Sequence, residues 1–241
     1  MNKKQIMFII LFFFNIYTKP EKMKLYAVYT PSHTVLKDQW FLPSIQDDFD
    51  LVIKFHNQTC HSASFMEKGW TKTTIKKVEL IIQAVQENWG KIFIFSDVDI
   101  QFFGPIQKKI EQLMKNKDIL VQKNSPKNGI CSGFFACRGN EKTLQLWQNA
   151  YQIMLNNEAI SDQAALSSCL KGNMTKNIAW DYLPDIFFGG GTLTGCHWTP
   201  TKQLPIPKNI IMHHANWTKG IRYKIMQLQY VRNEVKRGQN K

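Results

Sequence analysis

Cysteine is scarce in this chain of 241 residues, and none of its five cysteines belongs to a Cys-x-x-Cys pair. The absence of such a pair argues against a structural zinc site. An odd count does not suit a disulfide framework, although one or two bridges could form in a secretory compartment. The fold must therefore rest on a hydrophobic core, for which a hydrophobic content of 44% is enough.

Acidic residues are also few. The chain has 31 Lys and Arg against 18 Asp and Glu, which gives a net charge of +13 and a pI of about 9.5. This excess favours an anionic partner such as a nucleotide diphosphate, a nucleic acid or an anionic membrane surface. The sequence has no Arg-rich arm and no basic stripe interleaved with aromatics, so we do not expect nucleic-acid binding.

No apolar run reaches the length of about 20 residues that a membrane span needs. The longest one, residues 6–17, follows Lys3 and Lys4 and resembles a secretory signal. We interpret residues 1–20 as a signal-like or anchor segment, which would bring membrane association or entry into the secretory pathway. A domain that starts at Met23, and is then cytoplasmic, or a buried first element are the alternatives.

The sequence lacks internal repeats and shifts in composition, so we expect one α/β domain over residues 24–237. Its strands and helices alternate, which predicts a Rossmann-like domain with a mixed central sheet flanked by helices. Apolar alternation predicts strands at residues 24–30, 51–55, 92–95, 119–121, 129–137 and 210–212. Helical spacing predicts helices at residues 71–89, 105–114, 141–155, 161–170 and 221–235, and residues 187–192 read as a flexible, exposed turn.

The most informative segment is the strand at residues 92–95, because Asp97 and Asp99 follow it directly. In an open α/β sheet, ligands bind beyond the carboxyl ends of the strands. Two carboxylates at that place suit a divalent cation that carries a phosphorylated ligand. The same spacing occurs at Asp48 and Asp50, but that pair precedes a predicted strand and therefore lies at the wrong end of it.

Four other segments place polar groups at predicted strand ends or loops. Residues 30–33 offer the hydroxyls of Thr30 and Ser32 for a base or ribose, and residues 128–135 offer small side chains that allow a ligand to approach closely. Asp162 and Gln163 open a helix, where they could cap it or contact a ligand. Residues 213–220 contain two histidines and a lysine, which suit a cation and a phosphate.

Together these segments resemble the GT-A-fold nucleotide-sugar glycosyltransferases of the retaining, nucleotide-diphospho-sugar transferase kind, over roughly residues 24–224. The resemblance implies that Asp97 and Asp99 hold Mn²⁺ or Mg²⁺ on the donor diphosphate, with Asp99 as the principal ligand. It implies that one of two neighbouring histidines, His213 or His214, supplies a third ligand to the metal. Spacing to the lysine favours His213, and the His-x-Asn pattern favours His214.

The resemblance also implies a diphosphate-binding lysine, Lys219, and a nucleotide-binding loop at Thr30 and Ser32. It places Asp162 and Gln163 beside the donor sugar and its anomeric carbon. Asp185 is a weaker candidate for the acceptor side.

The expected function is metal-dependent transfer of a hexosyl or pentosyl group from a nucleotide-diphosphate sugar, presumed to be a UDP-sugar, to a glycan, lipid or protein, with retention. Two alternatives stay open. One is an inactive sugar- or nucleotide-binding protein of the same fold. The other is a metal-dependent phosphotransferase, although Gln101 stands where that chemistry usually has Thr or Val.

Overall fold

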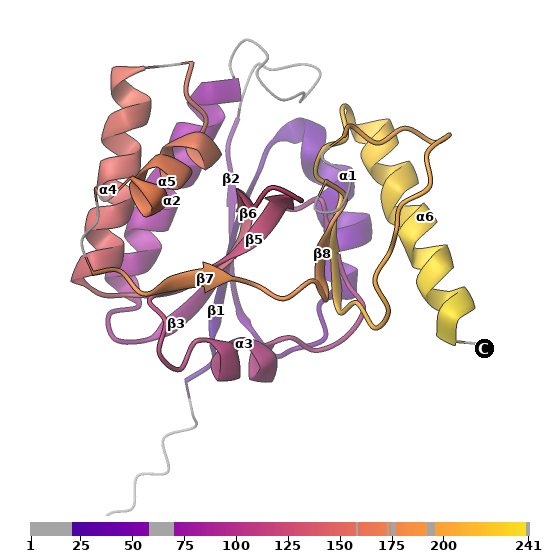
Figure 1. Ribbon diagram of the computed structural model, residues 1–241, viewed down its shortest axis with the longest axis horizontal. Coiled ribbons are helices and arrows are strands. Elements are labelled where there is room, and N and C mark those ends of the chain that lie inside the picture. Colours follow the sequence, from indigo (N-terminus) through magenta and orange to yellow (C-terminus); the bar gives the residue numbers. More distant parts are fainter. Residues whose placement is uncertain are drawn as a thin grey trace, which may run out of the picture.

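A six-stranded sheet in the order β2-β1-β3-β6-β5-β7 organises the chain (Figure 1). The computed structural model describes residues 21–57, 70–157, 159–172, 174, 177–191 and 196–239. The strands are β1 (Lys24–Tyr29), β2 (Asp50–Phe55), β3 (Ile92–Ser96), β5 (Ile119–Ser125), β6 (Gly129–Arg138) and β7 (Trp180–Tyr182). β1 pairs in parallel with β2 and β3, and β6 runs antiparallel to β3 and β5, so the sheet is mixed as predicted.

The two central strands are buried on both faces because their apolar side chains alternate between two cores. Phe93 and Phe95 of β3 pack on one side of the sheet, and Ile94 packs on the other. In β6, Phe135 belongs to the first core and Phe134 to the second. This two-sided burial fixes the end of β3, where Asp97 follows.

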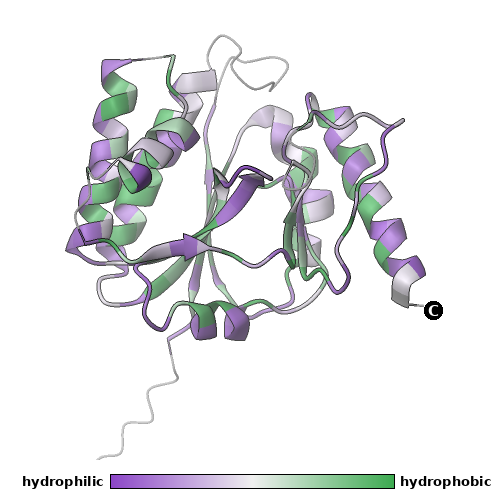
Figure 2. Ribbon diagram, viewed as in Figure 1, coloured by the Kyte–Doolittle hydropathy of each residue, from purple (hydrophilic) through white to green (hydrophobic). Residues whose placement is uncertain are grey.

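Three helices cover the first face of the sheet: α2 (Trp70–Glu87), α4 (Glu141–Asn156) and α5 (Asp162–Lys171). Their apolar sides point toward the strands, and their polar sides face outward (Figure 2). Asn140 caps α4 through a capping box with Thr143, and the Ser161 hydroxyl accepts the Ala164 amide at the start of α5. The cap at Ser161 sets where Asp162 and Gln163 begin their helix.

A second, three-stranded sheet lies on the other side, in the order β4 (Ile100–Phe102), β9 (Met212–His214), β8 (Phe187–Gly189). Around it lie a helical segment from Pro31 to Ser44, which contains α1 (Thr34–Leu36), and the helices α3 (Gln107–Leu113) and α6 (Ile221–Gln239). β4 starts one residue after Asp99 and pairs antiparallel with β9. This pairing brings His214 to the carboxylates.

The prediction of an exposed, flexible turn at residues 187–192 was wrong for residues 187–191, and residue 192 lies outside the described residues. Phe187, Phe188 and Gly189 form the buried strand β8, and Gly190 and Gly191 are buried as well. The Phe187 ring stacks on Phe134 with ring centroids 5.8 Å apart. The aromatic pair therefore drives this glycine-rich segment into the core, where the glycines allow close packing.

Three further predictions about the elements need correction. The last strand is Met212–His214 rather than 210–212, so both histidines belong to it. The sequence reading missed β4 and β7, whose three-residue lengths give too little alternation to detect. The last helix continues to Gln239, four positions beyond the predicted end.

Other predictions are confirmed. Gly90 follows α2 with a φ of 77°, as a terminating glycine should. Asp50 is the first residue of β2, so the pair with Asp48 does lie at the start of a strand. The predicted leader, residues 1–20, lies outside the described residues. Among the helices that are described, none has the length and apolarity to cross a membrane.

The core beneath α4 generates the first testable prediction. The Trp147 ring is fully buried and lies 4.9 Å from the Phe135 ring between centroids. Trp147→Ala should lower the free energy of unfolding by about 3–5 kcal/mol, because it removes that contact and leaves a cavity. Urea denaturation measures the loss. Trp89, which is 53% exposed, is the control, and its replacement by Ala should cost about 0.5 kcal/mol or less. Equal losses in the two variants would contradict this description of the core.

Candidate active site

A cavity of about 310 Å³ opens at the carboxyl ends of β1 and β3 and is lined by side chains from both sheets. One wall comes from the helices, through Lys77 of α2 and Asp162 of α5. The opposite wall comes from the segments that follow β8 and β9. Predicted site residues in the lining are Thr30, Asp97, Asp99, Asp162, Gln163, His214 and Lys219.

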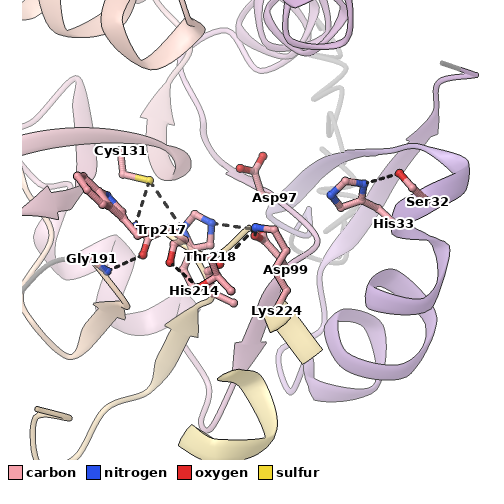
Figure 3. A network of polar contacts seen from close by, with 12 residues as sticks. Ser32, His33, Asp97, Asp99, Cys131, Gly191, His214, Trp217, Thr218 and Lys224 are labelled. Atoms are coloured by element: carbon pink, nitrogen blue, oxygen red, sulfur yellow. Dashed lines mark hydrogen bonds and ion pairs between the residues drawn. The ribbon is translucent and has the colours of Figure 1, made fainter. Parts of the chain in front are cut away.

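Asp97, Asp99 and His214 meet at the floor of this cavity (Figure 3). One ligand atom from each lies within 4.8 Å of the other two. The Asp97 amide donates to the Gly133 carbonyl at 2.6 Å, and the Ala215 amide donates to the Asp99 carbonyl at 2.9 Å. The backbone of β6 and the end of β9 therefore hold the two carboxylates in place.

Gly133 leaves the room that this cluster needs. A Cβ atom there would lie 2.4 Å from Cε1 of His214 and 2.5 Å from Oδ2 of Asp97. Any side chain at this position would push the imidazole and the carboxylate apart. The small residues predicted to allow close approach in residues 128–135 therefore serve the cluster itself.

His214 is oriented by Gln122 of β5. Nε2 of Gln122 donates to the Phe187 carbonyl at 3.0 Å, so its Oε1 faces Nδ1 of His214 at 2.8 Å and accepts from it. That hydrogen bond leaves Nε2 of His214 directed at Oδ1 of Asp99, 3.2 Å away. Metal-binding imidazoles are commonly held in this way by a partner on the second nitrogen.

Asp99 also contacts a cation from α6. Nζ of Lys224 lies against Oδ2 of Asp99 and 3.3 Å from the Ala215 carbonyl. Burial by itself would raise the pKa of Asp99, but Lys224 and His214 hold it well below the usual range. Burial likewise opposes the charge on His214, and Asp99 overcomes it and raises the pKa of His214 to about 10.

Lys77 lies between the carboxylates of Asp97 and Asp162 and pairs with both. Its ammonium lies 3.0 Å from Oδ1 of Asp97 and 3.0 Å from Oδ2 of Asp162, which also accepts from the Ser132 hydroxyl at 2.7 Å. Burial would lower the pKa of Lys77, but the two carboxylates reverse this and raise it above its ordinary value. Burial raises the pKa of Asp97, although Lys77 opposes the shift.

His213 lies away from the cavity, on the opposite face of β9 from His214. Its ring stacks on Phe188 at 5.1 Å between centroids, and the side chain is fully buried. Burial lowers its pKa to about 3, so the imidazole is neutral. Successive residues of a strand point to opposite faces. Of the two predicted ligands, the structure therefore brings only His214 to Asp97 and Asp99.

The loop after β1 forms a small polar group of its own. The Thr30 hydroxyl lies 3.0 Å from Nδ1 of His33, and the Ser32 hydroxyl lies 3.1 Å from the same atom. Burial lowers the pKa of His33 to about 4, so the ring is neutral and leaves the loop uncharged. Thr30 and His33 line the cavity.

Besides His213, three predicted residues lie at the edge of the site or outside it. Ser32 is absent from the described lining of the cavity, although its neighbours Thr30 and His33 are part of it. Lys219 lines the cavity as an exposed side chain, separate from the carboxylate cluster. Asp185 pairs with Lys123 at 2.9 Å on the surface and is absent from the described lining of the cavity. It is therefore a poor candidate for a role beside the reacting groups.

Trp217 has an unusual backbone conformation. Its φ of 55° is left-handed, and the other described non-glycine residues with a positive φ are all Asn, which tolerates it. For a bulky residue this costs about 1–2 kcal/mol. The Trp217 indole donates to Oδ1 of Asn124 at 2.7 Å, its carbonyl accepts the Trp198 amide at 2.9 Å, and its ring lies over Gly191. These contacts hold the ring in the wall of the cavity.

Sequence reasoning missed three residues of the cluster. Lys77 gave a faint signal, because a lysine among the buried positions of α2 is out of place on an apolar face. Gln122 gave a similarly faint signal, because it is a polar residue directly after the apolar run of β5. Lys224 gave no signal in the sequence, since it is one of 31 basic residues and its partner, Asp99, lies 125 positions away.

The cluster fits a divalent cation. Two carboxylates and an imidazole are a donor set suited to Mn²⁺ and related ions, and carboxylates with waters suit Mg²⁺. His214 is protonated beside Asp99 and would release that proton when a cation binds. The spread of 4.8 Å allows one ion to reach all three ligand atoms, and Gln122 already orients the imidazole.

The bridging lysine generates a testable prediction. Lys77→Met should lower the free energy of unfolding by about 3 kcal/mol, because it leaves the buried carboxylate of Asp162 without its cation. Adding Asp162→Asn should restore much of the loss, since Asp162 is 3% exposed, whereas the Asp97 side chain is 32% exposed and stays hydrated. Urea denaturation compares the variants. Lys76→Met, which breaks an exposed pair with Glu79, should change little. If the double variant recovers none of the lost free energy of unfolding, the proposed charge pairing is contradicted.

Comparisons with known proteins find a family and a relative for this chain. The sequence model of the nucleotide-diphospho-sugar transferase family matches residues 42–228, which include the Asp97, Asp99 and His214 cluster. An uncharacterized protein of Arabidopsis thaliana is 23% identical over 178 residues, which cover 72% of this chain and 50% of that protein. The chain thus spans about half the length of this curated relative.

Solved structures show the same fold at low sequence identity. A glycosyltransferase involved in the glycosylation of the major capsid of PBCV-1 is 12% identical, with a TM-score of 0.58 over 87% of this chain and 100% of that one. The glycosyltransferase GlyE of Streptococcus pneumoniae is 12% identical, with a TM-score of 0.52 over 88% of this chain and 62% of that one. The mixed sheet with flanking helices is the GT-A glycosyltransferase fold, and the chain belongs to the nucleotide-diphospho-sugar transferase family.

Proposed function

We propose that the protein is a metal-dependent glycosyltransferase that moves a sugar from a nucleotide-diphosphate donor to a hydroxyl group of an acceptor. The proposed donor is a UDP-sugar. The observation that carries this proposal is the convergence of Asp97, Asp99 and His214 on the floor of one cavity. The family match supports a nucleotide-sugar donor.

Asp97, Asp99 and His214 would hold Mn²⁺ or Mg²⁺, with Asp99 as the principal ligand and Asp97 on the nucleotide side. When bound, the cation supplies Lewis acidity at the diphosphate oxygens. Lys219, exposed at the edge of the cavity, would contact the same diphosphate as a point charge.

The nucleoside would lie against Thr30 and Ser32. The hydroxyls of these two residues lie 3.1 Å apart, beyond the end of β1, where open α/β sheets bind their ligands. A hydroxyl can both donate and accept, so the pair suits the edge of a base or a ribose. Neutral His33 leaves this end of the cavity free of additional charge.

Asp162 and Gln163 would contact the donor sugar from the helix wall. In the transfer, the bond from the anomeric carbon to the diphosphate oxygen breaks, and a bond from that carbon to the acceptor oxygen forms. The acceptor proton passes to the departing diphosphate, which leaves as part of the nucleoside diphosphate. Asp97, Asp99 and Asp162, the carboxylates in the described lining, are all in ion pairs, which supports a route without a carboxylate base and hence retention.

A third prediction concerns Asp99. With Mn²⁺ and a panel of UDP- and GDP-sugars, the wild-type protein should release nucleoside diphosphate, and Asp99→Asn should reduce release by about 100-fold or more, in the range seen when a key electrostatic group is removed. Asp50→Asn, taken from the second Asp-x-Asp pair, should leave the rate unchanged. Circular dichroism shows whether each variant is folded.

The same assay separates the enzyme from its alternatives. An inactive relative would be stabilised thermally by nucleotide sugars and Mn²⁺ without releasing product. A phosphotransferase would form a phosphorylated product instead of a glycoside. Full activity in a folded Asp99→Asn protein would remove the metal assignment.

A fourth prediction separates the two histidines. His214→Ala should weaken Mn²⁺ binding by about 10- to 100-fold, as expected for loss of a metal-site group. His213→Leu should leave Mn²⁺ affinity unchanged, because its ring lies in the core beside Phe188. Isothermal titration with Mn²⁺ and UDP gives both affinities. The reverse result would show that the ligand is His213.

A further inference from the structure

The two walls of the cavity differ in chemistry. The helix wall presents Lys77, Asp162 and Gln163, which suit the hydroxyl groups of a bound sugar. The opposite wall presents the indole of Trp217 and the imidazole of His197, whose ring centroids lie 5.4 Å apart at an angle of 46°. The two rings form an angled aromatic surface on a wall where Lys219 is the residue assigned to the donor.

Trp217 is held there at a cost in backbone conformation. A left-handed residue is ordinarily Gly or Asn, and either would relieve the strain. Residues kept in strained conformations by their surroundings cluster at functional sites. Here the hydrogen bond to Asn124, the packing on Gly191 and the carbonyl contacts keep the ring facing the cavity.

The position of Trp217 separates it from the nucleoside end. Asn124, its partner, belongs to β5, and Thr30 follows β1; β3 and β6 lie between these strands in the sheet. Three strand spacings correspond to about 14 Å. Figure 3 shows Trp217 on one side of Asp97 and Asp99, and His33 and Ser32 on the other. A ligand at Trp217 therefore lies beyond the donor diphosphate.

We infer that Trp217 and His197, with Asn124 fixing the indole, form the acceptor subsite, and that it takes a terminal sugar ring of a glycan. This inference rests on the proposed function. A pyranose or furanose ring has an apolar face of C–H groups, which packs on an aromatic ring, and a rim of hydroxyls. Asn216 and Thr218, on the same wall, are polar groups suited to that rim.

The composition of this wall favours a glycan over a lipid or peptide. Its described lining residues are Asn124, His197, Asn216, Trp217, Thr218 and Lys219, none of them aliphatic. An acyl or prenyl chain would need aliphatic contacts along its length. An extended peptide would need a free strand edge or a row of pockets, and the described wall offers one aromatic surface.

Acceptor kinetics test the inference. The probes are methyl glycosides of glucose, galactose, mannose, xylose and arabinose, compared with a Ser/Thr peptide and farnesyl phosphate, with the donor that the wild-type protein turns over. Trp217→Leu should raise the KM for the preferred glycoside by about 30-fold, as for a hot-spot aromatic, and leave the KM for the donor within about twofold. Trp217→Phe should restore most of the loss, and Trp89→Leu should change neither KM.

The alternatives give different results. A rise in donor KM, an unchanged glycoside KM in folded Trp217→Leu, or transfer only to the peptide or to farnesyl phosphate would each overturn the inference. If Trp217→Leu does not fold, His197→Ala replaces it, since the exposed His197 carries little of the core. It should raise the glycoside KM by about tenfold, and no rise would count against the surface.

A second measurement does not depend on turnover. Saturation-transfer NMR detects methyl glycosides bound to the protein without donor. If the wild-type protein releases no nucleoside diphosphate from any donor, the proposed function fails. Glycoside signals present in the wild type and lost in Trp217→Leu would still establish the sugar-binding surface, and their absence in the wild type would refute it.

Discussion

The structure depends on the balance of charge inside one cavity. Asp99 and Asp162 are carboxylates with little access to water, and the partly exposed Asp97 lies beside them. Buried charges are stable only when they are paired and hydrogen-bonded. Lys77 forms ion pairs with Asp97 and Asp162, and Lys224 and His214 form ion pairs with Asp99. Because these cations come from α2, α6 and β9, both layers of the fold must be docked before the carboxylates are compensated. Site and fold are therefore stabilised by the same contacts.

The sequence predicted the parts of the fold that repeat regularly. The alternating strands around β3 and the amphipathic helix α2 were found because burial on two faces or on one stripe leaves a clear pattern. Asp97 and Asp99 were singled out for the same reason, since the strand before them was certain. Short strands such as β4 gave no pattern. Gly190 and Gly191 resembled a loop because their packing partners, Gln227 and Trp217, lie elsewhere in the chain.

The candidate site was only partly readable, because its geometry depends on strand faces and distant pairings. His213 and His214 cannot be told apart without the register of β9, in which His214 lies opposite Ile100. A one-residue change in register exchanges the two faces. The roles of Gln122 and Lys77 are set by neighbours far away in the chain, so their identity as buried polar residues became visible only in three dimensions.

The pairing of β4 with β9 also sets the order in which the molecule can be assembled. Asp99 meets Lys224 across 125 positions of chain, and closing so long a loop is entropically costly and slow. During synthesis, the carboxylates after β3 leave the ribosome well before the segment that neutralises them. The six-stranded sheet can form around β1, β3 and β6 before the three-stranded sheet, which needs β9 from late in the sequence. The binding cavity is therefore complete only when β9 and α6, which come late in the sequence, have docked on the rest of the fold.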